Sequence, residues 1–150
     1  MVRCTLIALT LGGIAFAAPQ DGWAQETVEY VNARAASDES AAPFSGAVWV
    51  GSTLYLSGTL GLDSGQVPET AEAEARNVMD NIKGVLESAG LTMDDLVSVQ
   101  IFASDVGDYA AFNGVYRTYF TREFPARAFV GAGTLLFGAR FEVMGIAARR

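Results

Sequence analysis

The stretch AEARNVMDNIKGVLESAGLTMDDLVSVQIF, residues 73–102, carries the clearest periodic signal in the chain. Its first half repeats apolar residues at the three- and four-residue spacing of one helix face. Those residues are Ala75, Val78, Met79, Ile82, Val85, Leu86 and Ala89. Gly90 follows them where a helix commonly ends, and the residues from Val97 to Phe102 then follow a strand pattern. The stretch therefore predicts a helix followed by a strand that is partly covered on both faces.

The flanking sequence predicts more strands and a second helix. Upstream, apolar runs at residues 26–32, 46–50 and 53–57 indicate three strands. Gly51-Ser52 suits a tight hairpin turn, and residues 63–66 carry a second turn signal. Downstream, the pattern predicts a helix over residues 105–121 and strands over residues 127–132 and 140–148. This order indicates an α/β (α+β) domain, in which a mixed sheet carries both helices on one face.

Such a sheet holds more apolar strand residues than two helices can cover. They are Val48, Val50, Leu54, Leu56, Val99, Ile101, Val143 and Ile146. Large exposed apolar patches are unusual in monomers. We therefore expect an oligomer that buries the second face of the sheet.

Residues 1–24 are typical of a secretory signal peptide, because Met1-Val2-Arg3 is positive and residues 4–18 are uncharged. The apolar run is shorter than the about 20 residues that a membrane-spanning helix needs. Cleavage is expected after Ala24, with a second site after Ala17 and an uncleaved anchor as alternatives. The expected mature protein is one domain, residues 25–150, that is periplasmic or secreted and has no membrane segment.

Composition excludes several kinds of chemistry. The chain has no histidine, and its single cysteine, Cys4, lies in the expected signal peptide. Imidazole bases, thiolate nucleophiles, disulfides and the usual soft metal ligands are therefore not expected in the mature protein. The net charge of −7 and the single lysine, Lys83, argue against a nucleic-acid partner. The acidic residues Glu72, Glu74, Asp94 and Asp95 are interpreted as solvated helix or turn charges.

A series of short segments, in a fixed order over residues 42–150, resembles a known family. The segments are Ala42-Pro43-Phe44-Ser45, Leu56-Ser57-Gly58, Ala75-Arg76-Asn77 with Asn81-Ile82, Ala89-Gly90-Leu91, residues 109–113, Phe124-Pro125-Ala126-Arg127 and Gly145-Ile146-Ala147. They look like those of the Rid (reactive intermediate deaminase) family, also called YjgF or L-PSP. The resemblance implies a chorismate-mutase-like protomer in a homotrimer with pockets at the subunit interfaces. It also implies hydrolysis of short-lived enamines and imines, such as 2-aminoacrylate, without a metal or organic cofactor.

The resemblance assigns roles to individual residues. Arg127 matches the arginine that holds the substrate carboxylate, and the rigid fork of a guanidinium suits that role. The alternative for Arg127 is a structural ion pair at a strand end. Asn113 is expected to orient pocket groups or to support the interface by a hydrogen bond. Ser57 and Gly58 match a strand end whose backbone lines the pocket, although Gly58 could also mark a simple strand bend.

Three positions depart from the pattern of active family members. Phe44 replaces a tyrosine, Phe129 replaces a frequent cysteine, and Met144 replaces the glutamate proposed to handle protons or position water. Methionine cannot transfer a proton, and such assistance is typically worth about 100- to 10,000-fold in rate. Glu142 shares a strand face with Met144, and it could compensate only if the pocket were shifted.

These residues leave three hypotheses open. The leading one is an exported enamine/imine deaminase, in which Arg127 binds a small carboxylate and backbone groups near Ser57 and Phe129 place water. The second is a non-catalytic trimer that binds small carboxylates, which Met144 favours. The third is a structural trimer with a closed pocket, in which Arg127 pairs internally with Asp or Glu. A ribonuclease is disfavoured, because the chain has no histidine and no basic groove is expected.

Overall fold

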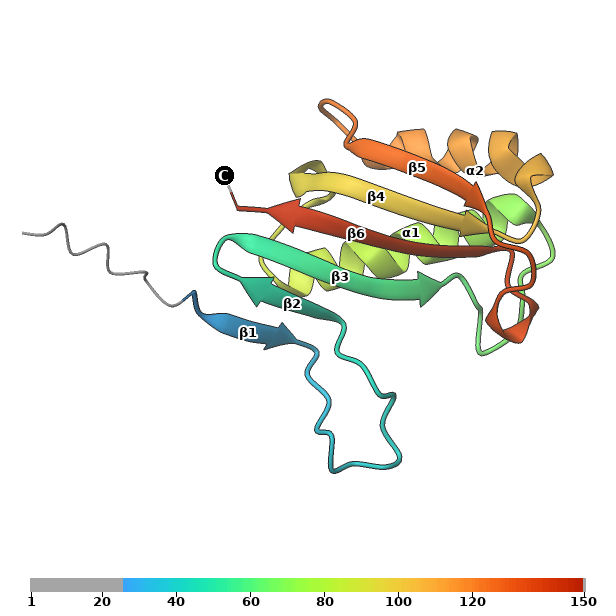
Figure 1. Cartoon of the computed structure of the whole chain (residues 1–150). Coiled ribbons are helices and arrows are strands. Elements are labelled where there is room, and N and C mark those ends of the chain that lie inside the picture. The colour runs from blue at the N-terminus through green and yellow to red at the C-terminus, as the bar shows by residue number, and fades with distance from the viewer. Residues whose placement is uncertain (1–25, 150) are drawn as a thin grey trace, which may run out of the picture.

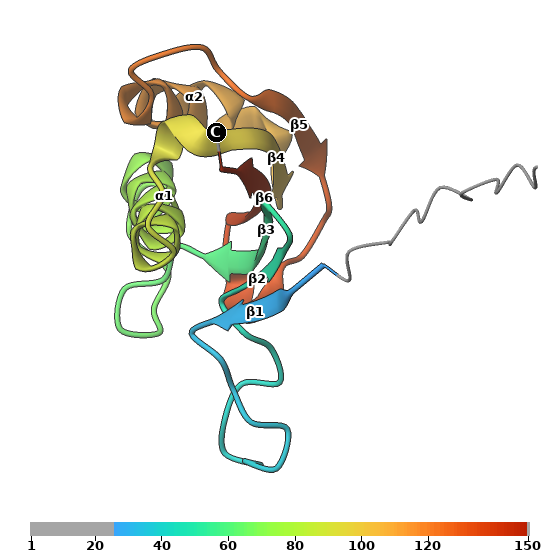
Figure 2. The ribbon, with the colours of Figure 1, turned by 90° about the vertical axis from the view of Figure 1, so that its left-hand side faces the viewer.

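The computed structural model describes residues 26–149, which form one mixed sheet and two helices (Figure 1). The elements are β1 (Val28–Val31), β2 (Ala47–Val50), β3 (Thr53–Leu60), α1 (Ala71–Ser88), β4 (Leu96–Ala103), α2 (Tyr109–Tyr116), β5 (Ala126–Gly131) and β6 (Phe141–Ala148). The strand order is β1-β2-β3-β6-β4-β5, and β4 and β5 are the parallel pair among antiparallel neighbours. Figure 2 shows both helices on the same side of the sheet, as predicted.

The two predicted turns lie before and after β3. Gly51 has a positive φ of 58° between β2 and β3, which are paired in antiparallel register. Asp63 and Gln66 exchange two backbone hydrogen bonds of 2.8 Å across the second turn. Two asparagine side chains of α1 then hold the end of β3, because Asn77 donates to the Gly61 carbonyl and Asn81 to the Leu60 carbonyl.

The core lies between the helices and the sheet. Val78, Met79, Ile82 and Leu86 of α1 are buried against the sheet. Five of the eight apolar strand residues named above also face this core, which corrects the set assigned to the uncovered face. They are Leu54, Leu56, Val99, Ile101 and Val143. Strand alternation separates these five residues from Val48, Val50 and Ile146.

The uncovered face of the sheet nevertheless keeps an apolar centre. Val48 of β2 lies opposite Tyr55 of β3, and Tyr55 lies opposite Ile146 of β6. Tyr55 is 48% exposed. Burial of this face in an oligomer stays a prediction.

The second helix is shorter than the residues 105–121 predicted. Helix α2 has one 3₁₀ turn before it, Val106–Asp108, and another after it, Arg117–Tyr119. The Asp105 side chain accepts a 2.7 Å hydrogen bond from the Gly107 amide and so caps the first, tighter turn. Within residues 26–149, no helix is long and apolar enough to cross a membrane.

Glu74 is fully buried, which corrects its interpretation as a solvated charge. Its Oε1 accepts from the backbone amides of Arg140 at 2.6 Å and Phe141 at 3.0 Å. Its Oε2 lies 3.0 Å from Nη1 of Arg140, which also donates to the carbonyl of Pro68. These bonds therefore tie the beginning of α1 and the loop before it to Arg140 and to Phe141, the first residue of β6.

Candidate functional site

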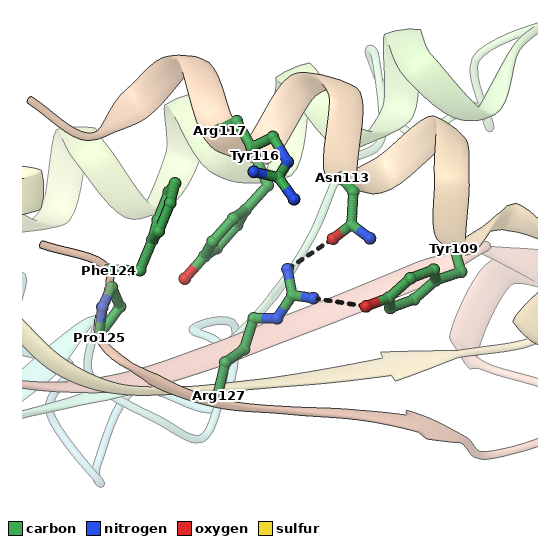
Figure 3. Close-up of a pocket in the computed structure, with 7 residues that line it drawn as sticks. All are labelled: Tyr109, Asn113, Tyr116, Arg117, Phe124, Pro125 and Arg127. Atoms are coloured by element: carbon green, nitrogen blue, oxygen red, sulfur yellow. Dashed lines mark hydrogen bonds between the residues drawn. The ribbon is translucent and has the colours of Figure 1, made fainter.

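Arg127 lies near the start of the edge strand β5, with its side chain on the helix-facing side of the sheet. It is paired with the buried Val99 of β4 and is itself half-buried. Nη1 donates a 2.7 Å hydrogen bond to Oδ1 of Asn113, and Nη2 makes a long, 3.5 Å contact with the hydroxyl of Tyr109 (Figure 3). The guanidinium is thereby oriented by two side chains of α2.

Two aromatic rings of the same helix flank this guanidinium. Its Cζ lies 4.7 Å from the ring centroid of Tyr116 and 5.7 Å from that of Tyr109. Both distances lie within the range of a cation–π interaction. Tyr109, Asn113 and Tyr116 follow each other at spacings of four and three residues, which place them on one helix face. Helix α2 therefore presents a continuous polar and aromatic wall to Arg127.

This wall and the segment before β5 enclose a hollow of about 220 Å³. It is lined by Tyr109, Asn113, Tyr116, Arg117, Phe124, Pro125 and Arg127. None of these seven residues is acidic. Among the described residues, the ion pairs involve Lys83, Arg122 and Arg140, and none involves Arg127. The hollow thus contains a half-buried cation that no carboxylate of the described chain neutralises.

The Tyr116 hydroxyl is the second unusual feature of the hollow. Tyr116 is 3% exposed, and its hydroxyl has no hydrogen-bond partner among the described residues. Burial raises the pKa of Tyr116 to about 12, although the Arg127 charge acts in the opposite direction. The hydroxyl therefore keeps its proton at neutral pH. A buried polar group without a partner costs about 1–3 kcal/mol, and a ligand acceptor in the hollow would remove that cost.

Phe129 lies on the same side of β5 as Arg127 but packs into the core. Its ring meets Tyr109 edge-on at 5.1 Å between centroids, and it also contacts Phe112 and Phe141. Phe129 therefore packs against Tyr109 and supports that side of the hollow, but it does not line the hollow itself.

Three other predicted site residues lie elsewhere on the protomer. Phe44, Ser57 and Gly58 line a separate hollow of about 80 Å³. The Ser57 hydroxyl donates a 2.7 Å hydrogen bond to the Ser45 carbonyl, and Phe44 is 56% exposed. Strand β3 is three places from β5 in the sheet, which corresponds to about 14 Å at the usual strand spacing.

Met144 lies on the uncovered face of the sheet, opposite Gln100 of β4. Glu142 lies on that same face, as its spacing predicts, and its carboxylate occupies the space that a side chain at Gly58 would need. One protomer thus brings Arg127 and Asn113 together, with Phe129 behind them. It does not bring Phe44, Ser57, Gly58 or Met144 to Arg127.

Sequence reasoning missed five residues that line the larger hollow: Tyr109, Tyr116, Arg117, Phe124 and Pro125. Tyr109 and Tyr116 could have been found from their helical spacing to Asn113. Phe124 and Pro125 precede Arg127 by three and two positions.

Within residues 26–149, no group of three or more His, Cys, Asp or Glu side chains is placed to hold a metal ion.

The sequence matches the family model described as endoribonuclease L-PSP over residues 12–149. The chain belongs to the L-PSP family. This confirms the resemblance to the Rid, YjgF or L-PSP proteins. A relative in this family, from Capra hircus, is named 2-iminobutanoate/2-iminopropanoate deaminase. It is 41% identical over 108 residues, which are 70% of this chain and 79% of the relative.

Solved structures of the L-PSP family have the same fold. The YjgF gene product from E. coli matches with a TM-score of 0.71 and 33% identity, over 81% of this chain and 99% of that chain. E. coli TdcF, solved with bound serine, matches with a TM-score of 0.70 and 27% identity, over 82% of this chain and 98% of that chain.

Proposed function

We propose that this protein hydrolyses 2-imino acids and their enamine tautomers to 2-oxo acids and ammonia. The observation that carries the proposal is the unneutralised, half-buried Arg127 in a hollow of about 220 Å³. Two likenesses support it: a relative named 2-iminobutanoate/2-iminopropanoate deaminase, and a related structure with bound serine, which carries a carboxylate.

Arg127 would bind the substrate carboxylate. Asn113 and Tyr109 engage one donor each, and a guanidinium has five, so three remain for the ligand. The Tyr116 hydroxyl, which lacks a partner among the described residues, would donate a further hydrogen bond. These groups would fix the carboxylate and thereby place the adjacent imine carbon in the hollow.

Hydrolysis then needs one water and no oxidant. Water adds to C2 of the imine, a proton passes to the nitrogen, and the resulting carbinolamine expels ammonia as the C2–O bond becomes a carbonyl. No carboxylate lines this hollow in the described protomer. The contribution of Arg127, Asn113 and Tyr116 is therefore orientation of the substrate, and the proton moves through water.

We further propose that the protein is a homotrimer, in which a neighbouring copy closes each hollow. Phe44 is 56% exposed and Tyr55 is 48% exposed, as expected for residues that contact another copy. The neighbour would supply Phe44, Ser57, Gly58 and Met144. Sedimentation equilibrium should give three times the protomer mass, and a monomer at working concentration would refute the assembly.

We also propose that the protein is exported and that the mature chain begins at Gln25. Residues 1–24 lie outside the described residues. The intact mass of protein recovered from the periplasm or the medium should match cleavage after Ala24. Recovery of the uncleaved chain in the cytoplasm would refute export.

The test of the activity is ammonia release from 2-iminobutanoate generated in situ. Arg127→Ala should lower kcat/KM at least about 100-fold, because it removes charged hydrogen bonds worth about 1.5–3 kcal/mol each. Arg127→Lys keeps the charge but loses the forked guanidinium, so its kcat/KM should lie between those of wild type and Arg127→Ala. Arg122→Gln is the control, since Arg122 pairs with Asp94 instead. Equal ammonia release by wild type and Arg127→Ala would refute the proposal.

The alternative is a non-catalytic binder of small carboxylates. Met144, at the position of the usual glutamate, favours it. Calorimetry with 2-oxobutanoate decides between the two, because binding that requires Arg127 without any acceleration of ammonia release would identify a binding protein.

A further inference from the structure

A second guanidinium reaches the hollow from the opposite side. Arg117 directly follows α2 and lines the same hollow as Arg127. Its Cζ lies 5.8 Å from the ring centroid of Phe124. Figure 3 shows Arg117 projecting from the helix and Arg127 from the strand below it, with both side chains directed into the space beside Tyr116.

The two cations of the hollow have no anionic counterpart in the described chain. Neither the exposed Arg117 nor the half-buried Arg127 takes part in an ion pair within residues 26–149. A cleft lined by one sign of charge concentrates ligands of the opposite sign. A ligand with two carboxylates could pair a separate carboxylate with each of the two guanidinium groups.

The buried Tyr116 hydroxyl provides an independent sign of a missing ligand. The Tyr116 ring lies next to Arg127, and its hydroxyl has no partner in the described chain. A ligand with two carboxylates offers enough acceptors for this hydroxyl and both guanidinium groups. The volume of about 220 Å³ is below the roughly 300 Å³ at which sites for drug-sized ligands begin, which restricts the ligand to a small metabolite.

We propose that Arg117 binds a second carboxylate, so that the preferred substrates are 2-imino dicarboxylates. This inference rests on the proposed function, because it names the substrate class of the same site. The reaction stays balanced: a 2-imino dicarboxylate and water give a 2-oxo dicarboxylate and ammonia. The four-carbon member of this class is 2-iminosuccinate, and Arg117 would hold the carboxylate that 2-iminobutanoate lacks.

The experiment compares kcat/KM for 2-iminosuccinate and 2-iminobutanoate, each generated in situ. Wild type should prefer the dicarboxylate at least about tenfold, and Arg117→Gln should lower that preference about tenfold, because a bidentate arginine–carboxylate pair is stronger than a simple exposed ion pair. Arg117→Lys should retain part of the preference. Arg122→Gln removes an exposed arginine five residues away and should leave the preference unchanged. The preference should also weaken as salt increases.

A preference that is absent in wild type, or unchanged by Arg117→Gln, would overturn this inference while hydrolysis of 2-iminobutanoate sustains the proposed function. If wild type hydrolyses neither imine, the proposed function fails, and calorimetry with succinate and butanoate then tests Arg117 separately. Tighter binding of succinate that depends on Arg117 would retain the dicarboxylate site. Equal affinities, or binding of succinate unaffected by Arg117→Gln, would refute it.

Discussion

Replacing Glu74 with alanine is expected to destabilise this protein more than replacement of any exposed acid on the same helix. Glu74 is fully buried, and its carboxylate accepts from the amides of Arg140 and Phe141 and from the Arg140 guanidinium. The Arg140 side chain is only 29% exposed, so after the substitution water could not fully replace the Glu74 carboxylate as the partner of its guanidinium. The amide of the buried Phe141 would have no acceptor.

The expected cost follows from these three hydrogen bonds. Breaking a buried ion pair by removing one partner costs about 3–5 kcal/mol. Glu74→Ala should therefore lower the free energy of unfolding by about 3–5 kcal/mol, which corresponds to roughly 12–20 °C in Tm for a domain of this size. Glu74→Gln keeps an acceptor for the two amides but turns an NH₂ group toward Arg140, and should cost about 1.5–3 kcal/mol.

Urea unfolding of the mature protein at one fixed protein concentration measures these differences. Trp49 is 4% exposed, so its fluorescence should report loss of the core. Glu72→Ala is the matched control, because Glu72 lies two positions earlier on α1 and is exposed, and it should change stability by about 0.5 kcal/mol or less. A Glu74→Ala protein within about 1 kcal/mol of the Glu72→Ala protein would refute the reasoning.

Three further substitutions test the site and its surroundings. Tyr116→Phe should stabilise the free protein by about 1 kcal/mol, because it removes the unpartnered hydroxyl, yet weaken 2-oxobutanoate binding in calorimetry. Wild-type stability should also fall as pH rises from 10 toward the raised pKa of about 12, and this loss should be smaller in Tyr116→Phe, in which Tyr119, whose pKa is also raised by burial, still contributes. Gly61→Ala should lower the free energy of unfolding in urea by about 1–3 kcal/mol, because the added Cβ would clash with the backbone carbonyl of Glu74. In Gly58→Ala the added Cβ would clash only with the movable carboxylate of Glu142, so the free energy should fall less; equal losses would contradict this. Met144→Glu should raise ammonia release at least about tenfold if a neighbouring copy brings this position to the imine, and Met144→Gln, which cannot transfer a proton, should not.

The sequence predicted the order of elements and the mixed sheet, because both depend on local signals. The spacing of Val78, Ile82 and Leu86 determines which face of α1 is apolar, and Gly51 marks the hairpin turn at a positive φ. The ordered family motifs also identified the L-PSP family. Each of these signals lies within a few residues along the chain, so one sequence suffices to recognise it.

Tertiary structure decided what depends on pairing between distant segments. Leu54 and Val143 both face the helices, because the pairing register of β3 and β6 puts the inward-pointing residues of the two strands on the same face of the sheet. No single strand encodes that register. In the sequence, Glu74 resembles an exposed helix acid, and only the fold brings Arg140, 66 positions later in the chain, against it.

The same distinction holds for the site. Arg127 was identified from its motif, but the structure shows that it has no carboxylate partner in the described chain and that Arg117 lines the same hollow. The sequence by itself determined which side chains were available for binding. The packing of α2 against β5 decided which of them meet, because the energy of a charge depends on the neighbours that folding places around it.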